Sequence, residues 1–373
     1  MKVLHLPFNT ASQASITVRA QRALGVEARG LVRNFSSIQD HSGIETMDWF
    51  GKPNPAGRLL RGIRWRLKMT RAMAWADVLH WHWGDTTWRG MDLRLAAWLR
   101  KPRLVEFWGD DLRDPETASR DNPFIARMYK QNPALAGCRS KPAQRLFQRH
   151  GFECLLPGVE LCDYLEAGVF AGYYQTRQRL PLENFTPRFP NPHKPRPLLV
   201  HAPSAKSKKG TEAVLSALDK LAKTHPFDFK LLHQMPRSQA LQTVAGCDVF
   251  LDQFTIGAEG LAALEAMALG KPVVCFIKPS LRARYPDSLP IVIADQNSLA
   301  ETVADLLADG QRRHELGVRS RRYVEEYHDA RHIAAELIDI YKELQSRTRA
   351  AAGAPVSRNR HWRPLPGAEG ESK

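Results

Sequence analysis

Short apolar runs alternate with amphipathic stretches along most of this chain. The first runs predict a strand over residues 2–6, a polar loop over 9–15 and a helix over 16–24 that ends before a glycine. Residues 77–84 and 103–113 each contain a further apolar run that ends in polar and aromatic residues. Strands that alternate with helices predict an α/β fold with parallel sheets, in which ligands bind at the carboxyl ends of the strands.

The clearest strand-to-helix unit lies in the second half of the chain. Residues 248–252 predict a strand, and an apolar helix that opens at residues 258–261 stops at Gly270 and leads into a β-branched strand. The loop between them would lie at the carboxyl end of a strand, where the amides that open a helix can hold an anion. Glu265, about two turns into the helix, would reach sugar hydroxyls of such a ligand. The alternative is a structural unit with a solvated glutamate.

A second unit carries a group of lysines. An apolar run over 197–201 predicts a buried strand, and an amphipathic helix begins near Thr211. The loop between them contains Lys206, Lys208 and Lys209, and point charges beside free amides suit a pyrophosphate. A solvated face is the commoner role of a lysine run. No Gly-x-Gly-x-x-Gly motif follows the first strand and no P-loop is present, which excludes the standard dinucleotide and P-loop sites.

Taken together, these units resemble the GT-B glycosyltransferases of family 4, which transfer a sugar from a nucleotide donor with retention of anomeric configuration. The resemblance covers most of the chain, from Met1 to about Leu344. It implies an α/β fold of two Rossmann-like, doubly wound domains that face a central cleft. It also implies a nucleotide-sugar donor, a glycan or lipid-linked acceptor, and no cofactor or metal ion.

The resemblance assigns the diphosphate contacts to the lysine loop. In the family, a strand and a basic loop precede a Lys-Gly pair, which matches Lys209 and Gly210, so Lys209 is implied to bind the pyrophosphate. The family's arginine five residues earlier falls on Ser204, and Lys206 is its natural substitute. Lys206 and Lys209 are therefore candidate catalytic residues that would stabilise the leaving diphosphate electrostatically.

The family's Glu-x7-Glu pattern gives the other donor positions. The second glutamate, which binds the ribose in the family, matches Glu265, whereas the first falls on Gly257. Glu259 is the neighbouring carboxylate in the same loop and is a further catalytic candidate. Gly260 and Leu261 match the positions whose backbone amides face the donor phosphates.

Candidate acceptor or cleft residues lie in the loops of the first half. Asn9 and Ser12 follow the first strand, and His82 could donate to a phosphate or a sugar hydroxyl, although a histidine among tryptophans is more often structural. The sequence Phe-Trp-Gly-Asp-Asp at 107–111 resembles the family's Phe-His-Gly-Ser-Asp. Trp108 takes the place of the histidine that touches the transferred sugar, and Asp111 matches the aspartate. Asp111 either binds acceptor or caps the following helix.

A chain of 373 residues exceeds one hydrophobic core. We expect an acceptor-side domain over residues 1–190, a proline-rich linker within 180–197, and a donor domain over 191–344. In the resembling family the terminal helix, here about 325–344, packs back on the first domain. Residues 345–373 are rich in Arg, Ala, Pro and Gly without periodicity and are expected to be disordered.

Cysteine spacing and hydropathy indicate the cellular compartment in which the protein is expected. The five cysteines form no Cys-x-x-Cys pair, so neither a metal cluster nor a disulfide framework is expected. The start of the chain is not typical of a signal peptide, and no apolar run approaches the ~20 residues that span a bilayer. We therefore expect a cytoplasmic protein.

The net charge of +15 is densest from Arg58 to Arg71. This segment predicts a helix in which six cations alternate with apolar residues. Such a helix can lie on an anionic membrane and make the protein peripheral at its inner face. The alternative is a surface helix whose apolar side chains pack on the first sheet.

The leading hypothesis is a glycosyltransferase of bacterial cell-surface polysaccharide or glycolipid synthesis. A sugar-nucleotide epimerase shares the architecture but requires carboxylates or histidines placed for proton chemistry. A nucleic-acid binder would use the cations and tryptophans to grip phosphates and stack bases. Because none of the compact recognition motifs occurs, we expect no nucleic-acid partner.

Overall fold

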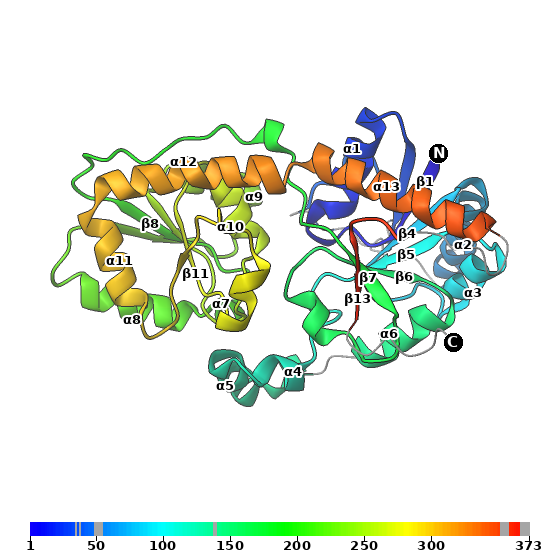
Figure 1. The fold of residues 1–373 in the computed structure, drawn as a ribbon, viewed down its shortest axis with the longest axis horizontal. Coiled ribbons are helices and arrows are strands. Elements are labelled where there is room, and N and C mark those ends of the chain that lie inside the picture. Colours follow the sequence, from blue (N-terminus) through cyan, green and yellow to red (C-terminus); the bar gives the residue numbers. More distant parts are fainter. Residues whose placement is uncertain (34–35, 37–38, 48–54, 137–139, 351–357, 366–373) are drawn as a thin grey trace. The chain divides into compact units, whose positions relative to one another are not determined.

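The computed structural model describes residues 1–33, 36, 39–47, 55–136, 140–350 and 358–365. The chain forms two compact units. Unit 1 comprises Met1–Asp114, Cys138–Arg179 and Ala330–Lys373, and unit 2 comprises Pro115–Gly137 and Leu180–Asp329. Each unit has its own sheet with helices around it (Figure 1).

Unit 1 contains, in its described part, an eight-stranded sheet of order β13-β7-β6-β5-β4-β1-β2-β3. The strands are β1 (Lys2–Pro7), β2 (Glu27–Val32), β3 (Glu45–Thr46), β4 (Val78–His82), β5 (Arg103–Glu106), β6 (Glu153–Leu156), β7 (Gly172–Gln175) and β13 (Trp362–Pro364). Neighbouring strands are parallel except for β13, which runs antiparallel to β7.

The helices of unit 1 cover this sheet. They are α1 (Gln13–Ala23), α2 (Pro55–Trp75), α3 (Met91–Trp98), α6 (Ser140–Arg149) and α13 (Ala330–Arg349), with 3-10 turns η1 (Thr10–Ser12) and η3 (Leu161–Tyr164). Figure 1 shows α13 beside α1, where the two helices pack together. Ile333, Leu337 and Ile340 recur on one face of α13 and are buried with Val3 and Val78 of the sheet. The amphipathic spacing of α13 therefore places it in the core of unit 1.

Unit 2 contains a parallel sheet of order β12-β11-β10-β8-β9. Its strands are β8 (Leu198–His201), β9 (Asp228–Leu231), β10 (Val249–Leu251), β11 (Val273–Cys275) and β12 (Val292–Ile293). Its helices are α4 (Pro115–Ser119), α5 (Pro123–Gln131), α7 (Lys206–Lys209), α8 (Thr211–Leu221), α9 (Arg237–Ala245), α10 (Leu261–Ala268), α11 (Leu299–Ala308) and α12 (Gly310–Tyr327). The 3-10 turns are η2 (Pro133–Ala136), η4 (Leu182–Asn184) and η5 (Pro279–Arg284).

The predicted strand-to-helix units are confirmed, with two local differences. Lys206 to Lys209 form the short helix α7 rather than a loop, and Gly210 ends it in the left-handed region with a φ of 71°. The terminal helical stretch is two helices, α12 and α13. They are separated by His328 and Asp329, and the carbonyl of His328 accepts the amide of Leu180 at 2.8 Å.

The unit boundaries differ from the predicted domains of 1–190 and 191–344. The proline-rich stretch packs along unit 2 rather than linking two bodies: Lys194 Nζ lies 2.5 Å from Asp248 Oδ2, and the Arg188 amide donates to Leu269 O. The segment 115–137, which lies between β5 and β6 in the chain, joins unit 2 because Phe124 is buried in its core.

Part of the tail predicted to be disordered is folded. Helix α13 continues to Arg349, and β13 pairs with β7. Arg358 lies 3.6 Å from Glu153 at the start of β6, so charge as well as strand pairing holds this part of the tail to the sheet. Residues 351–357 and 366–373 lie outside the described residues.

Candidate functional site

The lysine predicted to meet the diphosphate lies against a buried carboxylate at the carboxyl edge of the sheet of unit 2. Lys209 Nζ is 2.5 Å from Asp252 Oδ1. Asp252 directly follows β10, and its second oxygen accepts the Gly260 amide at 2.9 Å. Asp252 is buried, whereas the side chain of Lys209 keeps 12% of its surface exposed. The carboxylate therefore holds a cation and the start of α10 in one place.

The close approach of these groups leaves little space for a side chain at residue 260. A Cβ at Gly260 would lie 2.7 Å from Lys209 Nζ. Helix α10 begins at Leu261, as predicted, but the Gly260 amide already donates to Asp252. Of the two amides predicted to face the phosphates, that of Gly260 is used within the protein.

Glu265 lies in the second turn of α10, where Arg237 Nη2 at the start of α9 donates to its Oε1. The side chain of Glu265 is 13% exposed. Burial raises the pKa of this carboxyl, and the Arg237 charge opposes the shift. Arg237 thus fixes the orientation of the carboxylate that was predicted to bind ribose.

The position of the missing family glutamate, Gly257, has no room for a side chain. Its φ is 91°, and a Cβ there would overlap Lys278 Cγ. The Lys278 amide donates to Gly257 O at 2.9 Å, which holds the two segments together. Nearby, the Tyr285 hydroxyl donates to Glu259 Oε2. Tyr285 therefore holds the carboxylate of Glu259 in place.

The other two predicted donor residues are exposed. Ser204 precedes α7, and Lys206 is its first residue. Lys206 and Thr255 line a groove of about 730 Å³ between α5 and α8. The structure therefore brings Lys209, Gly260 and Asp252 together and leaves Lys206 on the surface beside them.

In unit 1, Asn9 and Ser12 shape the loop after β1. The Asn9 side chain accepts the Ser15 amide at 3.1 Å and donates to Asp40 O at 2.8 Å. Ser12 Oγ accepts the Asp40 amide at 2.8 Å. Both side chains thus bind the chain's own backbone near residue 40.

Asp111 organises the turn that follows β5. Its carboxylate accepts the amides of Trp108, Gly109 and Gly84 at 2.8, 2.9 and 2.8 Å. Burial raises its pKa to about 6, against the lowering effect of these amides. Asp111 is therefore neither a cap of a regular helix nor a solvated group.

His82 belongs to a fully buried polar cluster under Trp108. The rings of His80 and His82 are stacked with centroids 4.3 Å apart, and Trp108 stacks on His82 at 6.2 Å. Glu106 Oε2 lies 3.3 Å from His80 Nε2 and 3.0 Å from His82 Nδ1, and Arg179 Nη1 donates to Glu106 Oε1 at 3.0 Å. His82 therefore belongs to the interior of unit 1, and its partners were not predicted.

His5 of β1 completes this cluster. Its Nδ1 is 2.9 Å from His82 Nε2, and each of the rings of His5, His80 and His82 offers a nitrogen within 4.8 Å of the others. Such a set could ligate a metal ion. Arg179 already neutralises Glu106, so a divalent cation here would add buried positive charge. We therefore interpret the cluster as a hydrogen-bonded network that joins β1, β4 and β5.

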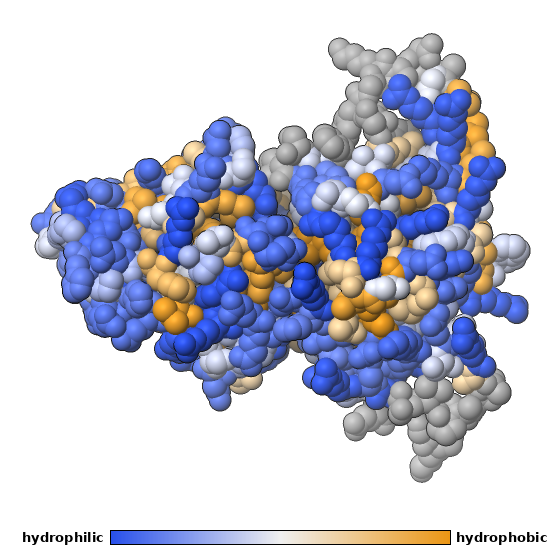
Figure 2. Space-filling view, turned by 90° about the horizontal axis from the view of Figure 1, so that it is seen from above, coloured by the Kyte–Doolittle hydropathy of each residue, from blue (hydrophilic) through white to orange (hydrophobic). Residues whose placement is uncertain are grey.

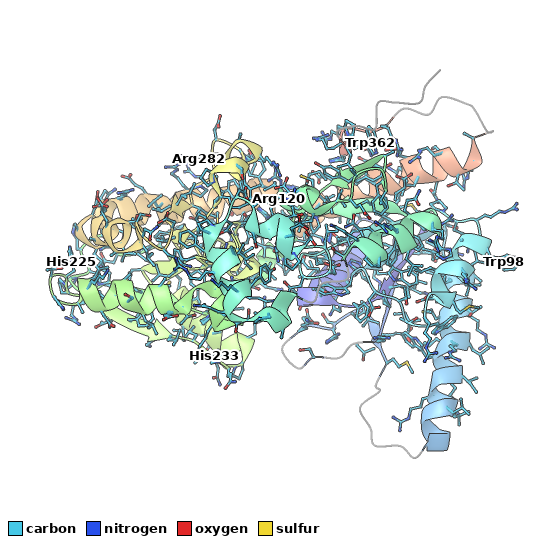
Figure 3. All side chains as sticks on the ribbon, turned by 90° about the horizontal axis from the view of Figure 1, so that it is seen from below. Trp98, Arg120, His225, His233, Arg282 and Trp362 are labelled. Atoms are coloured by element: carbon cyan, nitrogen blue, oxygen red, sulfur yellow. The ribbon has the colours of Figure 1, made fainter. Side chains whose placement is uncertain are left out.

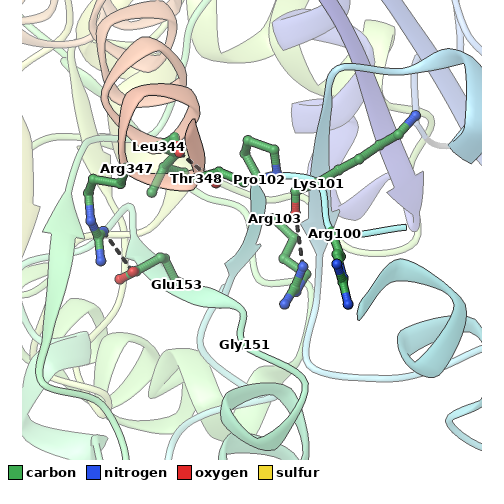
Figure 4. A pocket seen from close by; sticks show the side chains of 9 residues that line it. All are labelled: Arg100, Lys101, Pro102, Arg103, Gly151, Glu153, Leu344, Arg347 and Thr348. Atoms are coloured by element: carbon green, nitrogen blue, oxygen red, sulfur yellow. Dashed lines mark hydrogen bonds and ion pairs between the residues drawn. The ribbon is translucent and has the colours of Figure 1, made fainter. Parts of the chain in front are cut away.

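A basic pocket of about 300 Å³ lies at the opposite, amino-terminal ends of β5 and β6 (Figure 4). Figure 4 shows the side chains of Arg100 and Arg103 pointing the same way, while Arg347 pairs with Glu153 at 2.7 Å. Lys101 binds the last carbonyls of α2, including Met73 O at 2.9 Å. This pocket contains none of the predicted site residues.

Three residues of the donor region were missed by sequence reasoning. Asp252 carries a readable signal, since it is the polar residue that ends a predicted strand at a ligand-binding edge. Arg237 and Lys278 carry no such signal, because each reaches the site from a segment distant in sequence from its partner.

Among the described residues, none of the helices combines the length and the apolar character that a membrane span requires.

Comparison with known proteins supports this architecture. No family model and no curated protein matches the chain. It is similar to the solved structure of sucrose-phosphate synthase from Thermosynechococcus elongatus, with a TM-score of 0.64 and 13% identity over 93% of this chain and 100% of that chain. It is also similar to WaaG, a glycosyltransferase involved in lipopolysaccharide biosynthesis, with a TM-score of 0.53 and 15% identity over 91% of this chain and 99% of that chain.

A third similar structure is Anabaena HepE in complex with UDP and glucose, with a TM-score of 0.57 and 13% identity over 92% of this chain and 99% of that chain. These proteins are GT-B glycosyltransferases. The predicted GT-B fold is confirmed.

Proposed function

We propose that this protein is a retaining glycosyltransferase that uses a nucleotide-sugar donor bound at the carboxyl edge of unit 2. The observation that carries the proposal is the group formed by Lys209, Asp252 and Gly260 at the start of α10. A cation beside a helix start suits a diphosphate. The HepE structure contains UDP, which supports a uridine nucleotide as the first donor to test.

In this proposal the leaving diphosphate is stabilised by charge. Lys209 would meet the developing negative charge as the glycosidic bond breaks, and Asp252 would keep its ammonium group in place. Glu265, oriented by Arg237, would accept hydrogen bonds from the ribose. The chain's own cations supply this electrostatic role, so we propose a reaction that uses no cofactor or metal ion.

We further propose that the acceptor is lipid-linked or lies at an anionic membrane, as in cell-surface polysaccharide or glycolipid synthesis. Four large apolar side chains of α2 are exposed, by 65, 50, 43 and 52% for Leu59, Leu60, Ile63 and Leu67. The buried face consists of Trp65, Met69 and Met73. Figure 2 shows hydrophobic residues bordered by hydrophilic ones along the segment that projects at the upper right.

The exposed face of α2 suits the headgroup region of a bilayer. Its apolar side chains can insert into the bilayer, while the neighbouring Arg61, Arg64 and Lys68 attract anionic lipid. Trp98, at the end of α3, is 76% exposed and points outward in Figure 3, as interfacial tryptophans do. The side chain of Arg58 lies outside the described residues.

A thermal-shift screen against UDP, GDP, ADP, CMP and TDP sugars tests the donor part of the proposal. A ligand at about 100 times its dissociation constant should stabilise the protein by about 2.7 kcal/mol. Lys209→Met is the matched control and should lose the shift. If no nucleotide sugar shifts the melting temperature or is turned over, the donor assignment is wrong.

The two alternative functions, nucleic-acid binding and epimerisation, predict different results with the same purified protein. A nucleic-acid binder should retain random single-stranded oligonucleotide in a filter assay at physiological salt. An epimerase should convert the donor sugar without an acceptor. We expect neither result.

A further inference from the structure

The segment 115–137 lies between β5 and β6 of unit 1 in the sequence but folds as part of unit 2. We call this segment, which contains α4, α5 and η2, the arm. Phe124 of the arm is buried in the core of unit 2, with its ring edge-on to Phe276 at a centroid distance of 5.2 Å. The arm is therefore anchored in unit 2 and is not a surface excursion.

Asn122 of the arm is 1% exposed, and both polar atoms of its side chain form hydrogen bonds. Its Oδ1 caps α5 by accepting the amides of Phe124 and Ile125 at 3.1 and 3.2 Å. Its Nδ2 donates to the carbonyls of Thr255 and Ile256 at 2.8 and 3.0 Å. One side chain thus ties the arm to the loop that leads to Gly257 and Gly260.

The same loop is also held by residues that adjoin it in the chain and by the lysine turn. Gln253 Oε1 accepts the amides of Thr255 and Ile256 at 3.2 and 2.7 Å. The Phe254 amide donates to Lys209 O at 3.1 Å, so the loop rests directly on the lysine turn. Gln253 therefore binds the amides of Thr255 and Ile256, and Asn122 binds their carbonyls.

A second contact lies next to the first. Asp121 of the arm accepts Lys278 Nζ at 2.9 Å and Ser280 Oγ at 2.6 Å. Lys278 is the residue whose side chain fills the space at Gly257. The arm thus reaches the loop at Thr255, Ile256 and, through Lys278, at Gly257.

We propose that Asn122 is a positioning residue for donor binding, because it fixes the loop that sets Lys209 and the start of α10. This inference rests on the proposed function. The chain of contacts is short: Asn122 holds Thr255 and Ile256, and the adjoining residue Phe254 holds the backbone of Lys209. Loss of the Asn122 amide should loosen this loop and misplace the ammonium group that meets the diphosphate.

Asn122→Asp tests the role with minimal change. An aspartate keeps the acceptor that caps α5 but sets an oxygen against the carbonyls of Thr255 and Ile256. Asn122→Ser also keeps a cap and removes the donors without adding charge, so it serves if the aspartate variant does not fold. Asn184→Asp makes the same substitution at an exposed residue of η4 in unit 2, outside the groove that Thr255 lines, and is the control.

The probe is UDP, with the donor sugar that the screen identifies for kinetics. Both Asn122 variants should weaken UDP binding and raise the donor KM by about tenfold or more, measured well below their melting temperatures. Amides of residues 253–260 should exchange hydrogen faster, while those of β8 and α8 should not change. Asn184→Asp should match the wild type in each measurement.

Failures of the two proposals are distinguishable. If wild-type protein binds no nucleoside diphosphate, the donor assignment fails and the positioning role fails with it. If the wild type binds UDP, and the Asn122 variants exchange faster in the loop but keep wild-type affinity and KM, only the positioning role is overturned. Unchanged exchange in the loop would show that Asn122 does not hold it.

Discussion

At the residue scale, the ammonium group of Lys209 has two partners to satisfy. In the protein alone it neutralises the buried Asp252, and in the proposed complex it also meets the donor diphosphate. A buried carboxylate left without its cation is costly, so one substitution disturbs both stability and transfer. Separating the two effects requires a change at each partner.

Lys209→Ala should lower kcat/KM by about 100-fold or more, because a group aimed at the transition-state charge is removed. It should also lower stability by about 3 kcal/mol, since Asp252 loses its ion pair. The double variant Lys209→Ala/Asp252→Asn should regain stability but not activity. Urea unfolding and donor kinetics on the three proteins check this, and wild-type kcat/KM in Lys209→Ala would remove Lys209 from the site.

Glu265→Gln should raise the donor KM about tenfold and leave kcat nearly unchanged, because ribose hydroxyls do not change during transfer. Arg237→Gln should act in the same direction, since it releases the carboxylate. Steady-state kinetics with varied donor give both values. A collapse of kcat at constant KM would place Glu265 at the reacting carbon instead.

At the scale of elements, helix α2 has two faces with opposite roles. Its buried face joins the core of unit 1, and its outer face carries exposed leucine and isoleucine between cations. The alternative of a packed helix holds for Trp65, which is buried, but Leu60, Ile63 and Leu67 are exposed. Their substitution should therefore spare folding.

Changing Arg61, Arg64 and Lys68 to Glu should abolish sedimentation with anionic vesicles at low salt. Each cation near the surface contributes about 1 kcal/mol, so three reversals change the interaction by roughly 6 kcal/mol. Activity on a short soluble acceptor should persist. Wild-type protein that fails to sediment with such vesicles would contradict the proposal.

Leu60→Ser/Ile63→Ser/Leu67→Ser should weaken vesicle binding while leaving the melting temperature within a few degrees of wild type, because the three side chains are already exposed. Cosedimentation and thermal unfolding measure the two effects. A large loss of stability would show that this face packs against the protein.

At the scale of the whole molecule, the buried histidines make unit 1 sensitive to acid. Burial lowers the pKa of His80 to about 3 and that of His82 to about 4, and it lowers the pKa of His5 well below its usual value. Their charged neighbours are Glu106, which opposes the shift, and Arg179, which adds to it. Tyr341 of α13 contacts His80 Nδ1 at 2.6 Å, so the network also holds α13 to the sheet.

The three histidines should therefore cost no stability above about pH 6.5, where unfolded histidines are neutral, and their cost should grow as the pH decreases toward 4. Asp111, whose pKa is raised to about 6, offsets part of this loss because the folded protein binds its proton first. The unfolded chain binds protons in this window that the folded chain does not, which costs about 1.4 kcal/mol per pH unit for each histidine. His82→Gln should reduce the slope by about one proton. Urea unfolding at several pH values measures it, and an unchanged slope would mean that His82 is charged in the folded protein.

Much of the local structure follows from the sequence alone. The spacing of apolar residues is a property of short segments, so strands such as β4 and β8 and helices such as α1 and α10 could be predicted from it. Their alternation implies parallel sheets, and the resemblance gave the GT-B fold. The candidate positions Lys209 and Gly260 could be proposed from the sequence because they stand at the ends of such elements, and Glu265 because it lies in the second turn of a predicted helix.

Only the tertiary structure decided which groups pair and which face of each element is buried. Lys209 and Asp252 are 43 residues apart, and Asn122 reaches Thr255 across 133 residues. Such contacts depend on how distant segments pack, and local periodicity carries no information about them. The same is true of α2, whose alternating cations and apolar residues are compatible with either a packed or an exposed face until the sheet beside it is in place.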